Sequence, residues 1–100
     1  MVLEHALITV RSGTEDQFEE ALGRARAIIA SSPGFISLAL HRFVETPDRY
    51  LLLVEWETLE DHTVGFRESD AFGAWRALIG PFFGVPPEVG HLVPVEWPGH

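Results

Sequence analysis

The sequence contains no cysteine and no lysine, and each absence excludes a class of chemistry. Without cysteine the chain has no disulfide, no thiolate metal site and no thiol nucleophile. Without lysine, no side-chain amine can form a Schiff base with a carbonyl substrate. The seven basic residues are all arginines. Any chemistry that the side chains carry must therefore use histidine, carboxylate, hydroxyl or guanidinium groups.

Positive charge and long apolar runs are also scarce. The net charge is −8 at pH 7, and a surface of this sign repels nucleic-acid phosphates and anionic lipids. We therefore expect no nucleic-acid partner and no membrane partner. No apolar run approaches the roughly 18 residues of a membrane span, and the N-terminus does not resemble a signal peptide. These features favour a cytoplasmic protein.

The motifs of several common enzyme classes are missing as well. The sequence has no Gly-rich phosphate loop, no Gly-x-Ser-x-Gly elbow and no paired-carboxylate signature. Kinase, dehydrogenase and conventional hydrolase activities therefore have no support. A chain of 100 residues with 46% hydrophobic content is instead typical of one folded domain. We expect this domain to span residues 1–100, with a core over about 3–95 and a short tail over 96–100.

Residues 50–56 predict a strand with two apolar faces. Successive side chains of a strand point to opposite faces, so Leu51 and Leu53 share one face with Glu55. The other face carries Tyr50, Leu52, Val54 and Trp56. The chain provides about two helices, which can cover one face only. We therefore expect a second copy of the chain to cover the other face.

Hydrophobic periodicity predicts a helix over residues 14–30 and an interrupted helical region after residue 57. The first helix is expected to begin with a capping box between Thr14 and Gln17. In the second region, Thr58 is a candidate N-cap and Ser69 can cap a new helix. This second region therefore reads as two short helical pieces rather than one continuous helix.

Three further strands are expected, at residues 2–10, 35–44 and 89–95. Alternation along the second of them places Phe35 on the same face as Ser37. A turn at Pro47 and Asp48 joins that strand to residues 50–56 as an antiparallel hairpin. The order strand, helix, strand, strand, helix, strand predicts an α+β, ferredoxin-like fold with a four-stranded antiparallel sheet.

Three stretches, ITVRSGTEDQFEEAL, SPGFISLALHR and VEWETLEDH, share features with one known family. These features are a Gly-Thr turn after the first strand, a Pro-Gly-Phe at the second and a Trp that closes the third. In them the chain resembles antibiotic-biosynthesis-monooxygenase domains over about residues 3–95. The resemblance implies a homodimeric α/β barrel in which the sheet faces of two subunits pack together. Members of the family include cofactor-independent oxygenases of aromatic polyketides, quinol oxygenases, heme-degrading enzymes and many proteins of unknown role.

The chain departs from the heme-degrading branch of this family. Those enzymes resemble one another in an Asn on the first strand, a Trp at the end of the third strand and a His on the following helix. Only the Trp has a counterpart here, Trp56. His5 and Ala6 stand near the Asn position, and Phe66 takes the His position, with His62 one turn earlier. We therefore expect no heme cleavage and no cofactor.

His62 is the candidate catalytic residue. It follows the start of the second helical region and could point into a cavity beside Trp56. An imidazole with a pKa near neutrality can act as general base on a phenol, or it can bind heme iron. The alternative is a partly exposed histidine on the surface of the helix.

Aromatic side chains are concentrated between the end of the third strand and the end of the second helical region. Such side chains favour a flat aromatic ligand through stacking and apolar burial, although they are also typical of an ordinary core. The candidates for substrate binding are Trp56, Phe66, Phe72, Trp75 and Phe82, with Phe83 next to the last of them.

Arg67 and Arg76 are candidates for anchoring a carboxylate or phenolate of the ligand through paired hydrogen bonds. The alternative is surface ion pairing with Glu60, Glu68 or Asp70. No metal site is expected, because His5, His41 and His91 fall on three separate strands and no cluster has the spacing of metal ligands.

The sequence leaves two functions open. The first is a small cofactor-independent monooxygenase that acts on a phenolic, quinol or polyketide-type aromatic substrate. His62 would remove a proton from the substrate, which would then donate an electron to O2. This hypothesis follows from the family resemblance. The second is a non-catalytic dimeric domain that binds a small molecule or has an accessory role.

Overall fold

The computed structural model describes residues 1–99, and its elements follow the predicted ferredoxin-like βαββαβ order. The strands are β1 (Val2–Thr9), β2 (Phe35–Arg42), β3 (Arg49–Trp56) and β4 (Glu88–Leu92). The helices are α1 (Glu15–Ala30) and α2 (Asp70–Ile79). A π-helical turn, η1 (Asp61–Phe66), precedes α2, and a 3-10 turn, η2 (Gly80–Phe82), follows it.

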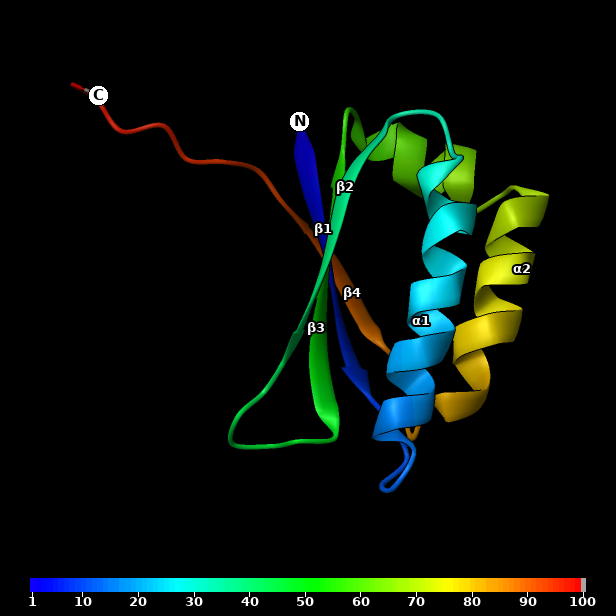
Figure 1. Ribbon diagram of the computed structural model, residues 1–100. Coiled ribbons are helices and arrows are strands. Elements are labelled where there is room, and N and C mark those ends of the chain that lie inside the picture. The colour runs from blue at the N-terminus through cyan, green and yellow to red at the C-terminus, as the bar shows by residue number, and fades with distance from the viewer. Residues whose placement is uncertain (100) are drawn as a thin grey trace.

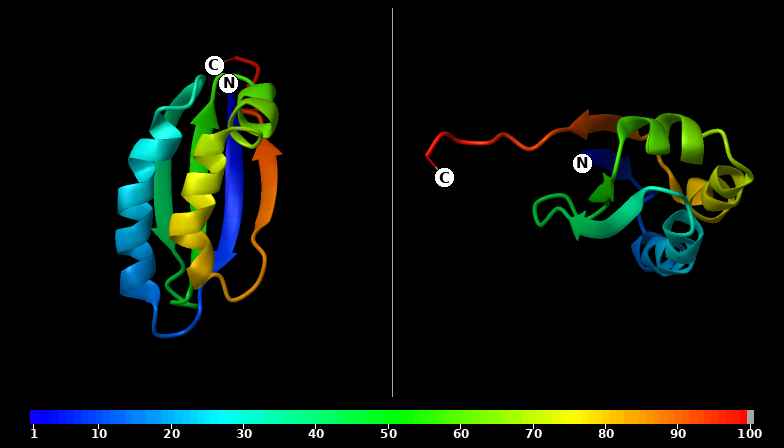
Figure 2. Two further views of the ribbon diagram at one scale, coloured as in Figure 1. Left: turned by 90° about the vertical axis from the view of Figure 1, so that its right-hand side faces the viewer. Right: turned by 90° about the horizontal axis from the view of Figure 1, so that it is seen from above.

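The four strands form one antiparallel sheet with the order β2-β3-β1-β4. Both helices pack against the same face of this sheet, and none of the described helices lies on the other face (Figures 1 and 2). β1 and β3 therefore occupy the centre of the sheet, with one face under the helices and one face open.

The alternation of side chains along β3 is confirmed. Tyr50, Leu52, Val54 and Trp56 lie under the helices and are at most 2% exposed. Leu51 and Leu53 point to the open face and are only partly buried. β1 repeats the pattern, with Leu3 and Leu7 on the open face. The single chain thus leaves a row of leucines partly in contact with water.

The helix over residues 15–30 has the predicted apolar stripe but not the predicted capping box. Phe18, Ala21, Leu22, Ala25 and Ile29 are all buried. The hydroxyl of Thr14 donates to the carbonyl oxygen of Arg11 at 2.6 Å, and it accepts no hydrogen bond from a backbone N–H of the helix. The carboxylate of Glu15 instead accepts from the backbone N–H of Gly13 at 2.9 Å. A side-chain bond back to the preceding turn has replaced the cap, as Ser and Thr residues commonly do.

The predicted face of Phe35 is wrong, because β2 contains a bulge between Phe35 and Ser37. An extra residue in one strand reverses the side-chain alternation beyond it. Phe35 therefore packs edge-on against Trp56, with ring centroids 6.0 Å apart. Ser37 faces the open side, where its hydroxyl donates to Glu55 at 2.6 Å.

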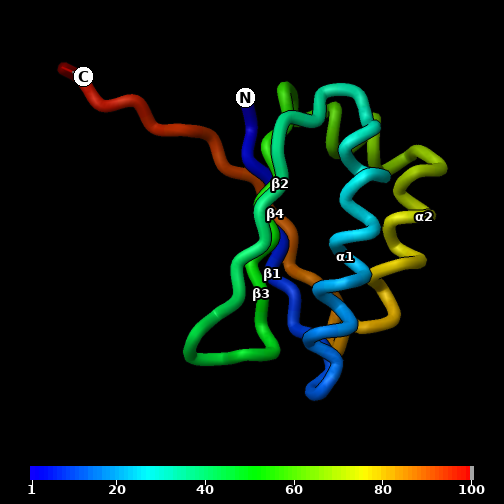
Figure 3. The backbone as a smooth tube through the Cα atoms, in the orientation of Figure 1, coloured from blue at the N-terminus to red at the C-terminus, as the bar shows by residue number. Residues whose placement is uncertain are grey.

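The last strand ends at Leu92 rather than at the predicted residue 95. Leu92 pairs with Leu3, so only Val2 of β1 and the preceding Met1 lie beyond it as possible partners. Pro94 also lacks the N–H that a further pair would need. Residues 93–99 extend away from the body on the side of the open face (Figures 1 and 3). His100, the last residue of the predicted tail, lies outside the described residues. Within residues 1–99, no helix has the length and apolarity needed to cross a membrane.

Candidate active site

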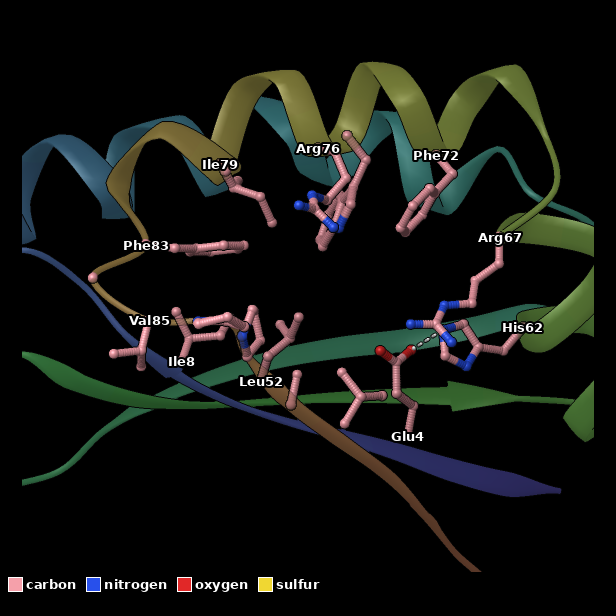
Figure 4. Close-up of a pocket in the computed structure, with 17 residues that line it drawn as sticks. Glu4, Ile8, Leu52, His62, Arg67, Phe72, Arg76, Ile79, Phe83 and Val85 are labelled. Atoms are coloured by element: carbon pink, nitrogen blue, oxygen red, sulfur yellow. Dashed lines mark ion pairs between the residues drawn. The ribbon is translucent and has the colours of Figure 1, made fainter.

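A cavity of about 450 Å³ lies between α2 and the half of the sheet formed by β1 and β4 (Figure 4). Its volume is within the range of small-molecule sites, roughly 300–1,000 Å³. Its apolar wall includes Ile8, Leu52, Phe72, Trp75, Ile79 and Phe83. Its ionisable groups are Glu4, His62, Arg67 and Arg76. The cavity therefore combines an apolar body with a few polar groups, as ligand sites commonly do.

The π-helical turn places His62 at one end of this cavity. The backbone N–H of Asp61 donates to the Thr58 hydroxyl at 3.1 Å, and the N–H of Thr58 donates to the Asp61 carboxylate at 3.2 Å. Thr58 thus caps the helical turn that begins at residue 59 and leads into η1, as predicted. The N–H of Arg67 then donates to the carbonyl oxygen of His62, five residues earlier, at 3.0 Å. The wide turn puts both His62 and Phe66 on the buried side, where they are 3% and 2% exposed. Such turns are frequent at functional sites.

A chain of polar contacts runs through His62 from the buried carboxylate of Glu4 to the edge strand β4. The Nε2 atom of His62 lies 3.3 Å from Oε1 of Glu4. Its Nδ1 atom lies 2.8 Å from Nε2 of His91. The indole N–H of Trp56 donates to the same Oε1 of Glu4 at 3.0 Å. Elements from across the fold thus meet around one carboxylate.

Burial shifts the pKa values of this cluster toward neutral forms. It raises the pKa of Glu4, while the hydrogen bond from Trp56 and the charge of Arg67 oppose the rise. It lowers the pKa of His62 to about 4, and the neighbouring His91 and Arg67 lower it further. The pKa of His91 is also lowered, first by burial and then by Arg67 and His5. His62 is therefore neutral near pH 7, and its single ring N–H points to only one of its two neighbours, Glu4 or His91.

Trp56 and Phe66 support the site from behind. Trp56 is fully buried and stacks on His62, with ring centroids 5.5 Å apart and planes at 21°. Phe66 packs edge-on against Phe72 at 5.5 Å and against Trp75 at 6.0 Å. These two rings fix the positions of side chains that line the cavity, and neither lines it.

The predicted site residues therefore divide into three groups. His62, Arg67, Phe72 and Trp75 line one cavity. Trp56 and Phe66 lie in the core behind it. Phe82 is not part of the lining and packs near Phe18, with centroids 6.4 Å apart, whereas Phe83 lines the cavity in its place. The interpretation of His62 as a partly exposed surface histidine is wrong.

The arginines lie at the cavity rather than in surface ion pairs. Within residues 1–99, neither Arg67 nor Arg76 pairs with a carboxylate, so the alternative pairing with Glu60, Glu68 or Asp70 is wrong. In Figure 4 the side chains of Arg67 and Arg76 extend from the helical layer toward the sheet. Two cations that pair with no carboxylate of residues 1–99 remain available to an anionic group of a ligand.

Glu4 and His91 were missed as site residues from the sequence. A signal for Glu4 was present, because it is a charged residue at an inward position between apolar Val2 and Ala6. His91 lies opposite Glu4 only in the register of β1 and β4, which the sequence does not reveal. Within residues 1–99, no group of three histidine or carboxylate side chains is placed to hold a metal ion. Nδ1 of His62 is hydrogen-bonded to His91, and its Nε2 lies 3.3 Å from Oε1 of Glu4.

Comparisons with known proteins match the whole fold. A family model described as "Antibiotic biosynthesis monooxygenase" matches residues 1–78. The uncharacterized protein YczJ of Bacillus subtilis (strain 168) is 45% identical over 92 residues, which cover 92% of this chain and 97% of YczJ.

Two solved structures extend this comparison. A Bordetella bronchiseptica protein with the same family description superposes with a TM-score of 0.93 and 42% identity, over 95% of this chain and 97% of that chain. SnoaB, a cofactor-independent oxygenase from Streptomyces nogalater, superposes with a TM-score of 0.79 and 20% identity, over 99% and 97% of the two chains. At that lower identity, the likeness to SnoaB concerns the fold alone.

Proposed function

The chain belongs to the antibiotic biosynthesis monooxygenase family, and from this premise we propose that it is a cofactor-independent monooxygenase. Its substrate is a phenolic, quinol or polyketide-type aromatic compound, bound in the cavity between α2 and the sheet. The observation that carries the proposal is the combination of an aromatic wall with a buried ionisable cluster at one end of the same cavity.

The reaction needs a base and a dry, flat site. Removal of a proton raises the electron density of a phenol or anthrone, and the resulting anion can reduce O2 without a cofactor. Phe72, Trp75 and Phe83 provide apolar surfaces for the ring system. Arg67 and Arg76 stabilise negative charge on the anion or on a carboxylate substituent. The base lies at the end of the cavity where Glu4 and His62 meet.

We propose further that the protein acts as a cytoplasmic homodimer of single-domain subunits, joined through the open face of the sheet. Leu3, Leu7, Leu51 and Leu53 are apolar and only partly buried on that face. A second subunit would remove them from water, with a gain of about 25 cal/mol for each Å² of apolar area buried.

Oxygen consumption tests the activity. The purified protein is mixed with a panel of quinols and anthrones in an oxygen-electrode cell, and uptake is compared with the rate of spontaneous oxidation. Uptake that is proportional to protein concentration supports a monooxygenase. A rate equal to that of the buffer with every member of the panel would instead indicate a binding or accessory domain.

A further inference from the structure

We propose that Glu4, rather than His62, is the general base of the cavity, and that His62 and His91 are positioning residues that hold its carboxylate ready. This inference rests on the proposed function, because the proton that Glu4 takes belongs to the aromatic substrate.

The two oxygens of Glu4 have different surroundings. Oε1 faces the indole N–H of Trp56 at 3.0 Å and Nε2 of His62 at 3.3 Å. The other oxygen has no hydrogen-bonding partner among residues 1–99, yet Glu4 is only 6% exposed and lines the cavity. Figure 4 shows the carboxyl group directed from β1 into the cavity. One oxygen is held by the protein and the other is free to meet a ligand.

His62 is less suited to this role, since both of its ring nitrogens have protein neighbours. Nε2 faces Glu4, and Nδ1 faces Nε2 of His91 at 2.8 Å. When Glu4 is ionised, an unprotonated Nε2 of His62 would place its lone pair against the carboxylate oxygen 3.3 Å away, so the proton of His62 lies on Nε2. Nδ1 then accepts the N–H of His91. Glu4 at Nε2 and His91 at Nδ1 thus favour the same tautomer of His62, and His62 in turn positions the carboxylate of Glu4, as second partners of catalytic groups commonly do.

The proton transfer can be written with all atoms accounted for. The O–H bond of a phenolic substrate breaks, its electron pair stays on the substrate oxygen, and the proton bonds to the free oxygen of Glu4. The substrate anion then reduces O2 and forms a carbon–oxygen bond to it. Glu4 returns its proton to the terminal oxygen, which gives a hydroperoxide and restores the carboxylate. The hydroperoxide then loses water as its O–O bond and the C–H bond of the same carbon break, so one atom of O2 stays in the product as a carbonyl oxygen and the other leaves in the water. O2 is the only oxidant that this sequence requires.

The groups around Glu4 adjust its basicity in a useful direction. Burial raises the pKa of Glu4 and so makes its ionised form a stronger base than an exposed carboxylate. Trp56 from β3 and the charge of Arg67 limit this rise. His62 from η1 and His91 from β4 are neutral near pH 7, because their pKa values are lowered. Arg76 faces the same cavity from α2.

The first test compares two isosteric variants, Glu4→Gln and Glu20→Gln, by steady-state oxygen uptake. Glu20 is an exposed carboxylate on α1, away from the cavity. We expect Glu4→Gln to lower kcat by about 10²- to 10⁴-fold, the usual contribution of a general base, with KM nearly unchanged. Glu20→Gln should match the wild type. A Glu4→Gln variant that is folded, as judged by its melting temperature, and retains the wild-type kcat would overturn the inference and leave the proposed function standing.

The second test needs no substrate, so it separates this inference from the activity. In ¹⁵N-histidine NMR at neutral pH, His62 of the wild type should carry its proton on Nε2. The variants Glu4→Gln and His91→Leu should give a mixture of both tautomers, and His41→Leu, which changes an exposed histidine on β2, should not. A wild-type His62 that carries its proton on Nδ1 would show that it does not position the Glu4 carboxylate. Absence of oxygen uptake by the wild type would instead overturn the proposed function.

Discussion

The indole N–H of Trp56 donates a 3.0 Å hydrogen bond to Oε1 of Glu4 inside the core. The same indole stacks on His62 at 5.5 Å. Trp56 closes β3, Glu4 lies near the start of β1, and η1 carries His62 over both. One buried side chain thus positions two members of the candidate site. This explains how a residue that does not line the cavity can still determine its chemistry.

Removal of this hydrogen bond should destabilise the fold. The substitution Trp56→Phe keeps an aromatic ring but leaves a buried carboxyl oxygen with one donor fewer. We expect the free energy of unfolding to fall by about 1–3 kcal/mol, measured by urea denaturation at neutral pH. Trp97→Phe is the matched control, because Trp97 is exposed in the tail. Equal losses in both variants would show that the bond to Glu4 contributes little.

The lowered pKa of His62 should make stability depend on pH. Its folded-state pKa is about 4, against an ordinary value of 6.5. Between these values the unfolded chain binds a proton that the folded chain does not. The stabilising contribution is therefore complete above pH 6.5 and is lost as the pH falls toward 4. It amounts to about 3 kcal/mol.

The measurement is a comparison of wild type with His62→Gln across that range. The free energy of unfolding of the wild type should fall more steeply with decreasing pH than that of the variant. Glu4 acts in the opposite direction, since its raised pKa stabilises the fold at low pH and this contribution is lost as the pH rises. Taking the difference between the two proteins isolates His62, and two parallel curves would contradict the prediction.

The two arginines should select ligands that carry a negative charge. Arg67→Gln and Arg76→Gln should each weaken the binding of 2-naphthoate by about 10- to 100-fold, because a hydrogen bond to a charged group contributes roughly 1.5–3 kcal/mol. Binding of the neutral 2-naphthamide should change little. Isothermal titration calorimetry measures both, with Arg24→Gln on the exposed surface of α1 as the control. The prediction is wrong if the carboxylate and the amide lose affinity together.

A charge on the open sheet face should separate the subunits. Leu53 lies near the centre of this face, opposite His5 on β1 and Ala39 on β2. In sedimentation at micromolar concentration, the wild type should behave as a dimer, and Leu53→Arg should give a single species of 11.2 kDa. Val44→Arg, in an exposed loop, should remain dimeric. A wild type that sediments as the 11.2 kDa chain would exclude the proposed dimer.

The fold could be predicted from the sequence because its strands alternate regularly. The period of two along β1 and β3 gave the correct faces, and the apolar stripe of α1 gave the correct buried side. The bulge in β2 could not be predicted, since an inserted residue leaves no mark on a run of apolar side chains. The last strand was predicted to be longer than it is. Its antiparallel partner β1 begins at Val2, so almost no residue of β1 is left to pair beyond Leu92.

The site was harder to predict than the fold, for two physical reasons. A regular α-helical period does not describe η1, whose wide turn carries His62 to the buried side. His91 meets Glu4 through the register of β4, a relationship between residues 87 positions apart that no local pattern contains. Which of the two neighbours Phe82 and Phe83 lines the cavity likewise depends on η2. This 3-10 turn ends at Phe82, and the extended backbone of Phe83 points its side chain in another direction.

The most direct test of a monooxygenase site in this cavity is the fate of isotopically labelled O2. The wild-type protein is incubated with an anthrone or quinol under labelled O2 in unlabelled water, and the product is examined by mass spectrometry. We expect a product that contains one labelled oxygen atom, formed by the wild type and much more slowly by Glu4→Gln. A product whose new oxygen comes from water, or no product above the uncatalysed rate, would contradict it.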